Sequence, residues 1–176
     1  MSIDIIGHAI VSADGMIASA DGTVPPALRN DIDWLRFQAA LDRAALVVIG
    51  RIAHRRFPNP GRKRLVATRS VTALEPDPRD PRASFWNPAG IGFPEAVERL
   101  GVTSGTIAVT GLFDLILPHF TGFDLAEAHS VTLPGGMACF VSGPPAEVLT
   151  AAGLQPGTAQ VLDPVANVTL TRWRKP

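Results

Sequence analysis

The feature that most constrains the fold is the alternation of short apolar runs with segments of helical periodicity. Apolar, partly β-branched runs occur at 3–11, 46–49, 65–67 and 106–110, and turn signals or helical segments separate them. Short runs that are apolar on both faces are typical of strands buried in a parallel sheet. The order of strand, helix, strand, strand, helix, strand and helix, then mostly strands, predicts an α/β fold with helices on both faces of the sheet.

The expected helices have recognisable ends. Asn30 is a suitable N-cap for a helix to about residue 44, with Asp31 and Asp33 in its first turn. Pro94 suits the start of a helix of about seven residues that stops at Gly101. The first of these helices has an expected apolar stripe of Ile32, Leu35, Ala39 and Leu41, and further helices are expected at 112–117 and 145–152.

The C-terminal part is expected to be mostly β. A strand is expected at 125–133, and the runs at 159–163 and 168–173 are close enough in sequence to form a hairpin. These runs predict an antiparallel C-terminal edge on an otherwise mostly parallel sheet. Residues 71–92 contain four prolines mixed with acids and are expected to form an ordered excursion or a flexible loop.

Length and composition indicate one or at most two globular domains, and because no interdomain linker is recognisable we expect a single domain over residues 1–176. Hydrophobic residues make up 46% of the chain, with 16 Gly and 16 Pro, which excludes a disordered chain. The single cysteine, Cys139, allows no internal disulfide and is expected in the core. The N-terminal run has no basic segment and includes Asp4, and the longest apolar run, 44–49, is too short to span a bilayer. We therefore expect a soluble, cytoplasmic protein without a membrane partner.

Positive charge is concentrated in one segment. The chain carries 16 basic and 16 acidic residues, yet eight of the basic ones and none of the acidic ones lie in 43–74. A neutral total argues against nucleic-acid binding. The basic segment contains two strand ends, Gly50-Arg51 and Thr68-Arg69-Ser70, where α/β sheets bind ligands. An Arg after a glycine turn, joined by hydroxyls of the neighbouring strand end, suits a phosphate dianion, although a solvated basic face would have the same composition.

Several kinds of chemistry have no motif here. The chain contains no dinucleotide-binding glycine fingerprint, no P-loop and no hydrolase nucleophile elbow. The histidines lack metal-ligand spacing and are expected to be structural or on the surface: His8, His54, His119 and His129. We therefore expect no metal site and no nucleophilic catalysis.

The carboxylates Asp31 and Asp33 are the remaining candidates for catalysis. They are two residues apart, so at most one of them can face the sheet. If Asp31 faces a cleft, its carboxylate could hold the N–H edge of a heterocycle through paired hydrogen bonds. Trp34 would then cover the cleft or belong to the core. Otherwise both acids simply complement the helix dipole.

Several stretches together resemble the dihydrofolate reductase superfamily, which includes the reductase domain of riboflavin biosynthesis. IDIIGHAIV followed by SADGMIA is similar to the first strand and mobile loop of that superfamily. PALRNDIDW resembles the stretch with its active-site acid, VVIGR and PGRKRLVATRS resemble its phosphate-binding strand ends, and IAVTGLFDLILP resembles its glycine motif. The resemblance spans most of residues 1–140 and implies a dihydrofolate-reductase-like sheet.

The resemblance also implies roles for individual residues. It places the catalytic acid on Asp31, and substrate contacts on Ile6, Leu28, Trp34, Val109 and, as a clamp for the folate carboxylate, Arg62. The cofactor would be NADPH. Arg51, Thr68, Arg69 and Ser70 would bind its 2′-phosphate after Gly50, Ala18 would close over the nicotinamide, and Gly111 would let the backbone approach the pyrophosphate.

The departures from the family pattern leave the substrate open. Thr110-Gly111 replaces two glycines, Pro26 replaces a Trp of the mobile loop, and Ala128 replaces a Thr that assists the acid. The first expectation is hydride transfer from NADPH to a C=N bond of a pterin, most simply dihydrofolate. The alternatives are a riboflavin-pathway reductase of a ribosylated pyrimidine, a reductase of another dihydropterin, or a non-catalytic NADP- or pterin-binding protein. By analogy, the protein could be a homodimer.

Overall fold

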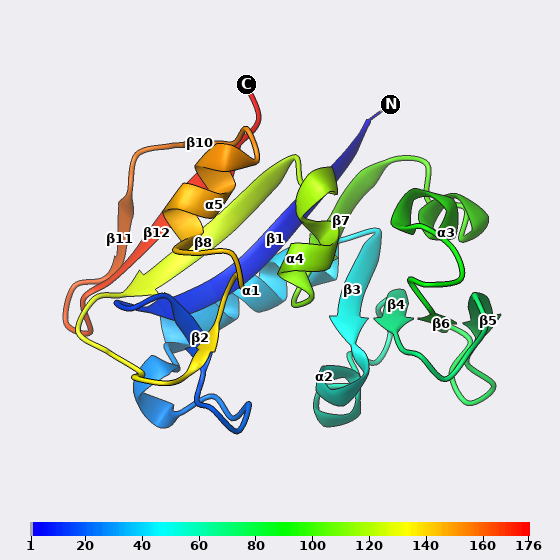
Figure 1. Ribbon diagram of the computed structural model, residues 1–176, viewed down its shortest axis with the longest axis horizontal. Helices are drawn as coiled ribbons and strands as arrows, with labels where there is room; N and C mark the ends of the chain where they lie inside the picture. Colours follow the sequence, from blue (N-terminus) through cyan, green and yellow to red (C-terminus); the bar gives the residue numbers. More distant parts are fainter. Residues whose placement is uncertain (1) are drawn as a thin grey trace.

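The computed structural model describes residues 2–176, which contain a central sheet of ten strands (Figure 1). Nine of them follow the order β10-β12-β8-β1-β7-β3-β4-β6-β5, and the tenth, β11, pairs with β12. The bounds are β1 Ile3–Ser12, β3 Leu46–Gly50, β4 Arg64–Ala67, β5 Leu74–Pro76, β6 Ala83–Trp86, β7 Gly105–Val109, β8 Gly122–Ala128, β10 Gln155–Pro156, β11 Gln160–Asp163 and β12 Val168–Arg174.

The centre of the sheet is parallel and both edges are antiparallel. The strands from β8 through β1, β7, β3 and β4 to β6 all pair in parallel. At one edge, β12 pairs antiparallel with β8, β10 and β11, which confirms the expected C-terminal edge and hairpin. At the other edge, β5 pairs antiparallel with β6.

The proline-rich stretch 71–92 is therefore an ordered excursion that extends the sheet. A fully buried arginine, Arg64, holds it in place by donating to the carbonyl of Pro58 and to the carboxylate of Asp80. Asn87 Nδ2 also donates to the carbonyl of Val71 at 2.9 Å. The charge pattern was compatible with a solvated basic face that would include Arg64. Arg64 is instead buried, because its carboxylate partner Asp80 lies in the excursion.

Helices cover both faces of the sheet, as expected (Figure 1). One face carries α1 (Asp31–Arg43), and the other carries α3 (Phe93–Arg99), α4 (Phe113–Ile116) and α5 (Pro145–Ala151). A short helix, α2 (Arg51–Arg56), follows β3 directly, and two 3₁₀ turns occur at Pro26–Leu28 (η1) and Leu117–His119 (η2).

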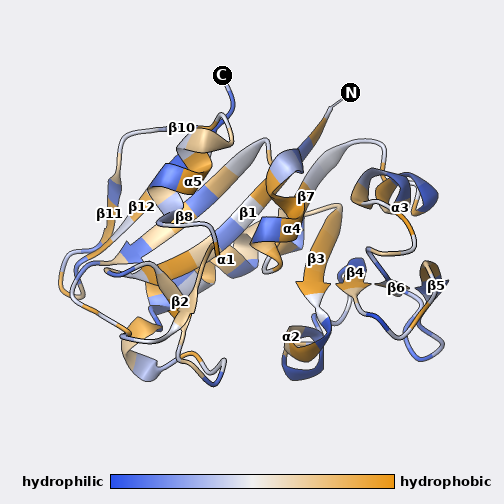
Figure 2. Ribbon diagram, viewed as in Figure 1, coloured by the Kyte–Doolittle hydropathy of each residue, from blue (hydrophilic) through white to orange (hydrophobic). Residues whose placement is uncertain are grey.

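The alternation of side chains along β1 divides the core between the two faces. Val11 belongs to the larger hydrophobic cluster beneath α3, α4 and α5, whereas Ile10 packs against the smaller cluster that contains Leu28. Cys139 is buried in the larger cluster, as expected, and burial raises the pKa of its thiol. Figure 2 shows β3 as hydrophobic along most of its length, in agreement with a strand covered on both faces.

The predicted cap of α1 is confirmed, and the predicted apolar stripe is confirmed at Leu41 but wrong at Ile32 and Leu35. Asn30 Oδ1 accepts a hydrogen bond from the backbone N–H of Asp33 at 3.0 Å. Ile32 and Leu35 are 46% and 70% exposed, whereas Asp33 and Leu41 are buried. The sheet beneath the first turns of α1 presents polar side chains, so a polar side of the helix faces it.

The shortest elements lack a sequence signal. Helix α2 has only six residues, and β2 (Met16–Ala18) and β9 (Met137–Ala138) form a separate two-stranded sheet. A hydrophobic period cannot be recognised over so few residues. The strand expected at 125–133 is β8, which begins earlier and ends at Ala128.

Gly7 is a position in β1 where the packing requires glycine. A Cβ there would lie 2.3 Å from two ring carbons of Phe123 and 3.1 Å from Phe120. We expect Gly7→Ala to lower the free energy of unfolding by about 2 kcal/mol, which corresponds to a decrease of roughly 5 °C in Tm. Thermal unfolding tests this, with Gly111→Ala as a control, because a Cβ at Gly111 would meet nothing within 4 Å. Equal Tm values for the two variants would contradict the packing argument.

Candidate functional site

The carboxyl ends of β3 and β4 bring the predicted phosphate-binding residues together. These strands are neighbours in the sheet, with Gly50 opposite Ala67. Arg51 follows β3 as the first residue of α2, and Thr68 follows β4. Nη1 of Arg51 donates to Oγ1 of Thr68 at 3.0 Å, and Oγ1 of Thr68 lies 3.0 Å from Oγ of Ser70.

This cluster of Arg51, Thr68 and Ser70 has unused capacity to bind an anion. The bond to Thr68 is the one side-chain hydrogen bond of Arg51 within residues 2–176. A guanidinium has five N–H donors, so most of the donors of Arg51 are free. Arg69 is exposed beside the cluster. The residues therefore fit a phosphate dianion in the way the sequence suggested.

The turn after β7 lies against the same strand end. A Cβ at Gly50 would lie 3.9 Å from Cδ2 of Leu112, the residue after Gly111. The hydroxyl of Thr110 donates to the carbonyl of Val48 at 3.1 Å, so this side chain bonds to β3. The space around Gly111 is open, so a ligand could approach the backbone there without a steric clash.

Leu112 is a residue of this turn that sequence reasoning missed. Its φ of 58° is left-handed, which is uncommon for a residue other than glycine. Such a conformation costs roughly 1–2 kcal/mol and is concentrated at functional sites. The sequence contains no signal for it, because leucine gives no indication of a positive φ.

The acid that faces the sheet is Asp33 and not Asp31, which corrects the sequence-based expectation. Asp31 is exposed in the first turn of α1, whereas Asp33 is 6% exposed. Oδ1 of Asp33 accepts from Nη2 and Nε of Arg36 at 2.8 and 3.2 Å. Burial raises the pKa of Asp33, and the charge of Arg36 opposes this increase. The N-cap Asn30 makes Asp33 the third residue of the helix, and this position points toward the sheet.

Asp33 belongs to a partly buried charge network that the sequence did not reveal. Nη1 of Arg36 lies 3.4 Å from Oδ2 of Asp124 in β8, and Nη2 of Arg174 in β12 lies 2.9 Å from Oδ1 of Asp124. His8 in β1 is paired with Asp124 on the adjacent strand β8, and its Nδ1 lies 3.8 Å from Oδ2 of Asp124. The network joins α1 to three adjacent strands, so no local pattern could predict it.

Four of the remaining residues predicted to contact substrate or nicotinamide are buried. Leu28 is fully buried in the smaller hydrophobic cluster, and its predicted substrate contact stays a prediction. Ile6 and Val109 are buried within their strands, and Ala18 is buried in β2, which pairs with β9. Trp34 is 48% exposed, with its ring 5.9 Å from that of Phe37.

Arg62 is held by α1 and by its own loop, not left free as a clamp. Nε and Nη2 donate to Oδ1 of Asp42 at 2.9 and 2.5 Å. Nη1 donates to Oε1 of Gln38 and Oδ1 of Asn59, and Nη2 donates to the carbonyl of Gln38. All five donors of the guanidinium are therefore engaged within the protein. Arg62 therefore links its loop to α1. In this structure it has no donor left for the predicted contact with a substrate carboxylate.

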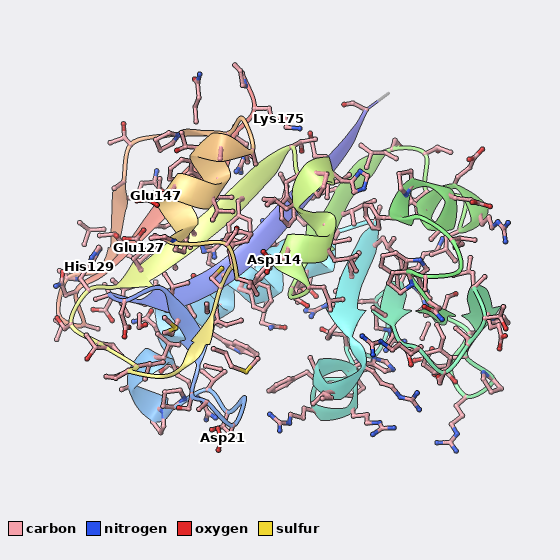
Figure 3. All side chains as sticks on the ribbon, viewed as in Figure 1. Asp21, Asp114, Glu127, His129, Glu147 and Lys175 are labelled. Atoms are coloured by element: carbon pink, nitrogen blue, oxygen red, sulfur yellow. The ribbon has the colours of Figure 1, made fainter. Side chains whose placement is uncertain are left out.

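The described residues, 2–176, hold no group of three or more His, Cys, Asp or Glu side chains that could bind a metal ion. His129 pairs with Glu127 at the end of β8, far from α2 (Figure 3), and its Nε2 lies 2.7 Å from Oγ1 of Thr169. Asp114 of α4, also labelled there, accepts from the backbone N–H of Val141 at 3.1 Å. Among residues 2–176, no helix has the length and apolar character needed to cross a membrane.

Comparisons with solved structures identify the fold. A riboflavin biosynthesis protein, so described, from Shewanella sp. PV-4 matches with a TM-score of 0.68 at 14% identity, over 98% of this chain and 99% of that one. Dihydrofolate reductase from Enterococcus faecalis, complexed with NADP(H) and RAB-propyl, matches with a TM-score of 0.66 at 14% identity, over 97% of this chain and 95% of that one. The chain therefore has a dihydrofolate-reductase-like fold, as its sequence led us to expect.

A third solved structure is bifunctional. It is a diaminohydroxyphosphoribosylaminopyrimidine deaminase and 5-amino-6-(5-phosphoribosylamino)uracil reductase from Thermotoga maritima, with a TM-score of 0.65 at 12% identity. The match covers 98% of this chain but 56% of that protein. No family model and no curated protein matches the chain by sequence.

Proposed function

We propose that the protein is an NADPH-dependent reductase that transfers a hydride to a C=N bond of a small heterocyclic substrate. The observation that carries this proposal is the cluster of Arg51, Thr68 and Ser70 at the carboxyl ends of two adjacent parallel strands. Its free guanidinium donors and hydroxyls suit the 2′-phosphate that distinguishes NADPH from NADH. The NADP(H) complex of a dihydrofolate reductase with the same fold supports this assignment.

The cofactor would supply the hydride, and the protein would supply position and charge. Asp33 takes the role that the family resemblance gave to Asp31, because Asp33 is the buried acid. Arg36 occupies Oδ1 of Asp33, while Oδ2 accepts no hydrogen bond from any residue in 2–176. That free oxygen can hold an N–H of the substrate and favour protonation of the ring beside the carbon that receives hydride.

The contacts of Arg62 support a substrate without a carboxylate tail. Dihydrofolate carries a carboxylate tail, and the residue expected to hold it has no free donor. A heterocycle without this tail fits better, either a dihydropterin or the ribosylated pyrimidine of a riboflavin-type reductase. The Asp33–Arg36 ion pair also favours a second candidate function, a non-catalytic protein that binds NADP or a pterin.

A substrate panel separates these possibilities. Oxidation of NADPH is followed at the nicotinamide absorbance band with dihydrofolate, a tail-free dihydropterin and the ribosylated pyrimidine. We expect turnover with one of the tail-free substrates and little with dihydrofolate. Efficient turnover of dihydrofolate would contradict the substrate assignment, whereas NADPH binding without any turnover would support the non-catalytic protein. A chain that does not bind NADPH would overturn the proposal as a whole.

Arg62 provides a direct test of the substrate argument. We expect Arg62→Ala to lower the free energy of unfolding by about 1 kcal/mol, since the guanidinium is bonded to α1 and to its own loop. The KM for the preferred substrate should not change. Thermal unfolding and steady-state kinetics measure the two effects. A selective increase in KM at unchanged Tm would restore Arg62 as a substrate clamp.

A further inference from the structure

His8 is a buried histidine for which the fold provides no hydrogen-bond partner. Its side chain is 4% exposed, and its Nδ1 is fully enclosed with no donor or acceptor among residues 2–176 in hydrogen-bonding position. The residues two positions away on the same face of β1 are Ile6 and Ile10, so an apolar side chain would suit the fold. Most buried polar atoms in proteins are hydrogen-bonded, and burying one without a partner lowers stability. The unpartnered Nδ1 of His8 therefore needs an explanation.

Charge balance does not supply that explanation. The charged groups acting on His8 are Arg36 of α1, Asp124 of β8 and Arg174 of β12. Asp33 pairs with Arg36, so the network contains two carboxylates and two guanidinium groups. Burial lowers the pKa of His8 to about 4, with Arg36 and Arg174 contributing and Asp124 opposing. His8 is therefore neutral near pH 7, and the network is balanced without it.

The position of Asp124 determines which ring nitrogen of His8 carries the proton. Oδ2 of Asp124 lies 3.8 Å from Nδ1, too far for a good hydrogen bond but close enough to favour the tautomer protonated on Nδ1. Nε2 then presents a lone pair. It makes no hydrogen bond within residues 2–176, and unlike Nδ1 it is not fully enclosed.

We propose that His8 contacts the substrate of the reductase, with Nε2 accepting a hydrogen bond from an N–H group of an aminopyrimidine ring. This inference rests on the proposed function and adds a second contact to that of Asp33. Both tail-free substrate classes, the dihydropterins and the aminopyrimidines, carry such N–H groups. Nε2 of His8 is an acceptor in this tautomer, as is Oδ2 of Asp33, so each of the two contacts selects an N–H donor of the substrate.

The two ring nitrogens can be tested separately with amide side chains. Asn places its amide near Nδ1 and has nothing at Nε2, whereas Gln reaches the position of Nε2. With a diaminopyrimidine as the probe and tryptophan fluorescence as the readout, we expect His8→Asn to weaken binding about tenfold. His8→Gln should retain affinity within about threefold, and His129→Asn, at the far end of β8, should bind like the unaltered protein.

Binding of NADPH should be unchanged in all three variants. If His8→Asn binds the diaminopyrimidine as tightly as the unaltered protein, His8 does not contact the ring. If the unaltered protein binds the diaminopyrimidine but not NADPH, the proposed function fails; a loss of that binding in His8→Asn would still show that His8 contacts the ring.

A measurement on the unaltered protein avoids the question of whether a variant folds. Nitrogen NMR of the imidazole distinguishes the two neutral tautomers. We expect the proton of His8 on Nδ1 near pH 7, and a chemical shift change at Nε2 when the diaminopyrimidine is added. A proton on Nε2, or an unchanged Nε2 signal on saturation with the probe, would overturn the proposal.

Discussion

Replacing Asp33 with Asn is expected to lower the turnover number about a hundredfold with the preferred substrate. Asn keeps the shape of the side chain but cannot carry the negative charge that would favour protonation of the substrate ring. Affinity for NADPH should not change, since the phosphate-binding cluster lies on β3, α2 and the end of β4. Steady-state kinetics and a fluorescence titration with NADPH measure the two effects.

Asp31→Asn is the matched control because it lies in the same turn of α1. Asp31 is exposed, so this change should leave turnover and Tm within error of the unaltered protein. If the two variants lose turnover equally, the buried carboxylate of Asp33 does not have the catalytic role proposed for it. If Asp33→Asn weakens NADPH binding as much as it slows turnover, a general disturbance of the fold explains the loss.

The pH dependence gives an independent check on Asp33. The role proposed for it requires the ionised carboxylate, and burial raises its pKa in the folded protein. Activity should therefore decrease as the pH falls through this raised pKa and be retained above it. In Asp33→Asn, this acidic limb should disappear from the residual activity.

The grouping of Arg51, Thr68 and Ser70 could be predicted because each of its two segments has its own signal in the sequence. A strand that ends in Gly50-Arg51 and another that ends in Thr68-Arg69-Ser70 each carry their own signal. The parallel order of adjacent strands then places the two ends together. The same reasoning assigned β1, β3, β4 and β7 to a parallel sheet, because they are short apolar runs.

The substrate side could not be predicted in this way. Whether Asp31 or Asp33 faces the sheet depends on the rotation of α1, and that rotation reflects Asp124 and His8 on distant strands. The apolar pattern suggested a different rotation, since Ile32 and Leu35 are apolar yet exposed. The contacts of Arg62 could not be predicted from the sequence either, because its partners Gln38 and Asp42 belong to a helix twenty or more residues earlier.

Arg51→Ala should weaken binding of NADPH about a hundredfold and leave binding of NADH unchanged. The guanidinium has most of its donors free, and each charge-assisted hydrogen bond to a phosphate contributes about 1.5–3 kcal/mol. NADH lacks the 2′-phosphate, so it cannot lose this contribution. Titration of both nucleotides, monitored by nicotinamide fluorescence, gives the two dissociation constants.

Arg55→Ala is the matched control, since Arg55 is exposed in the same helix, one turn beyond Arg51. It removes the same charge from α2 and so measures how much of the effect comes from the general positive potential, which salt would screen. If Arg55→Ala weakens NADPH binding as much as Arg51→Ala, the basic segment attracts the nucleotide without a defined site. A loss confined to Arg51 and to NADPH would mean that geometry selects the phosphate, because Thr68 orients the guanidinium and the open turn at Gly111 leaves room for the nucleotide.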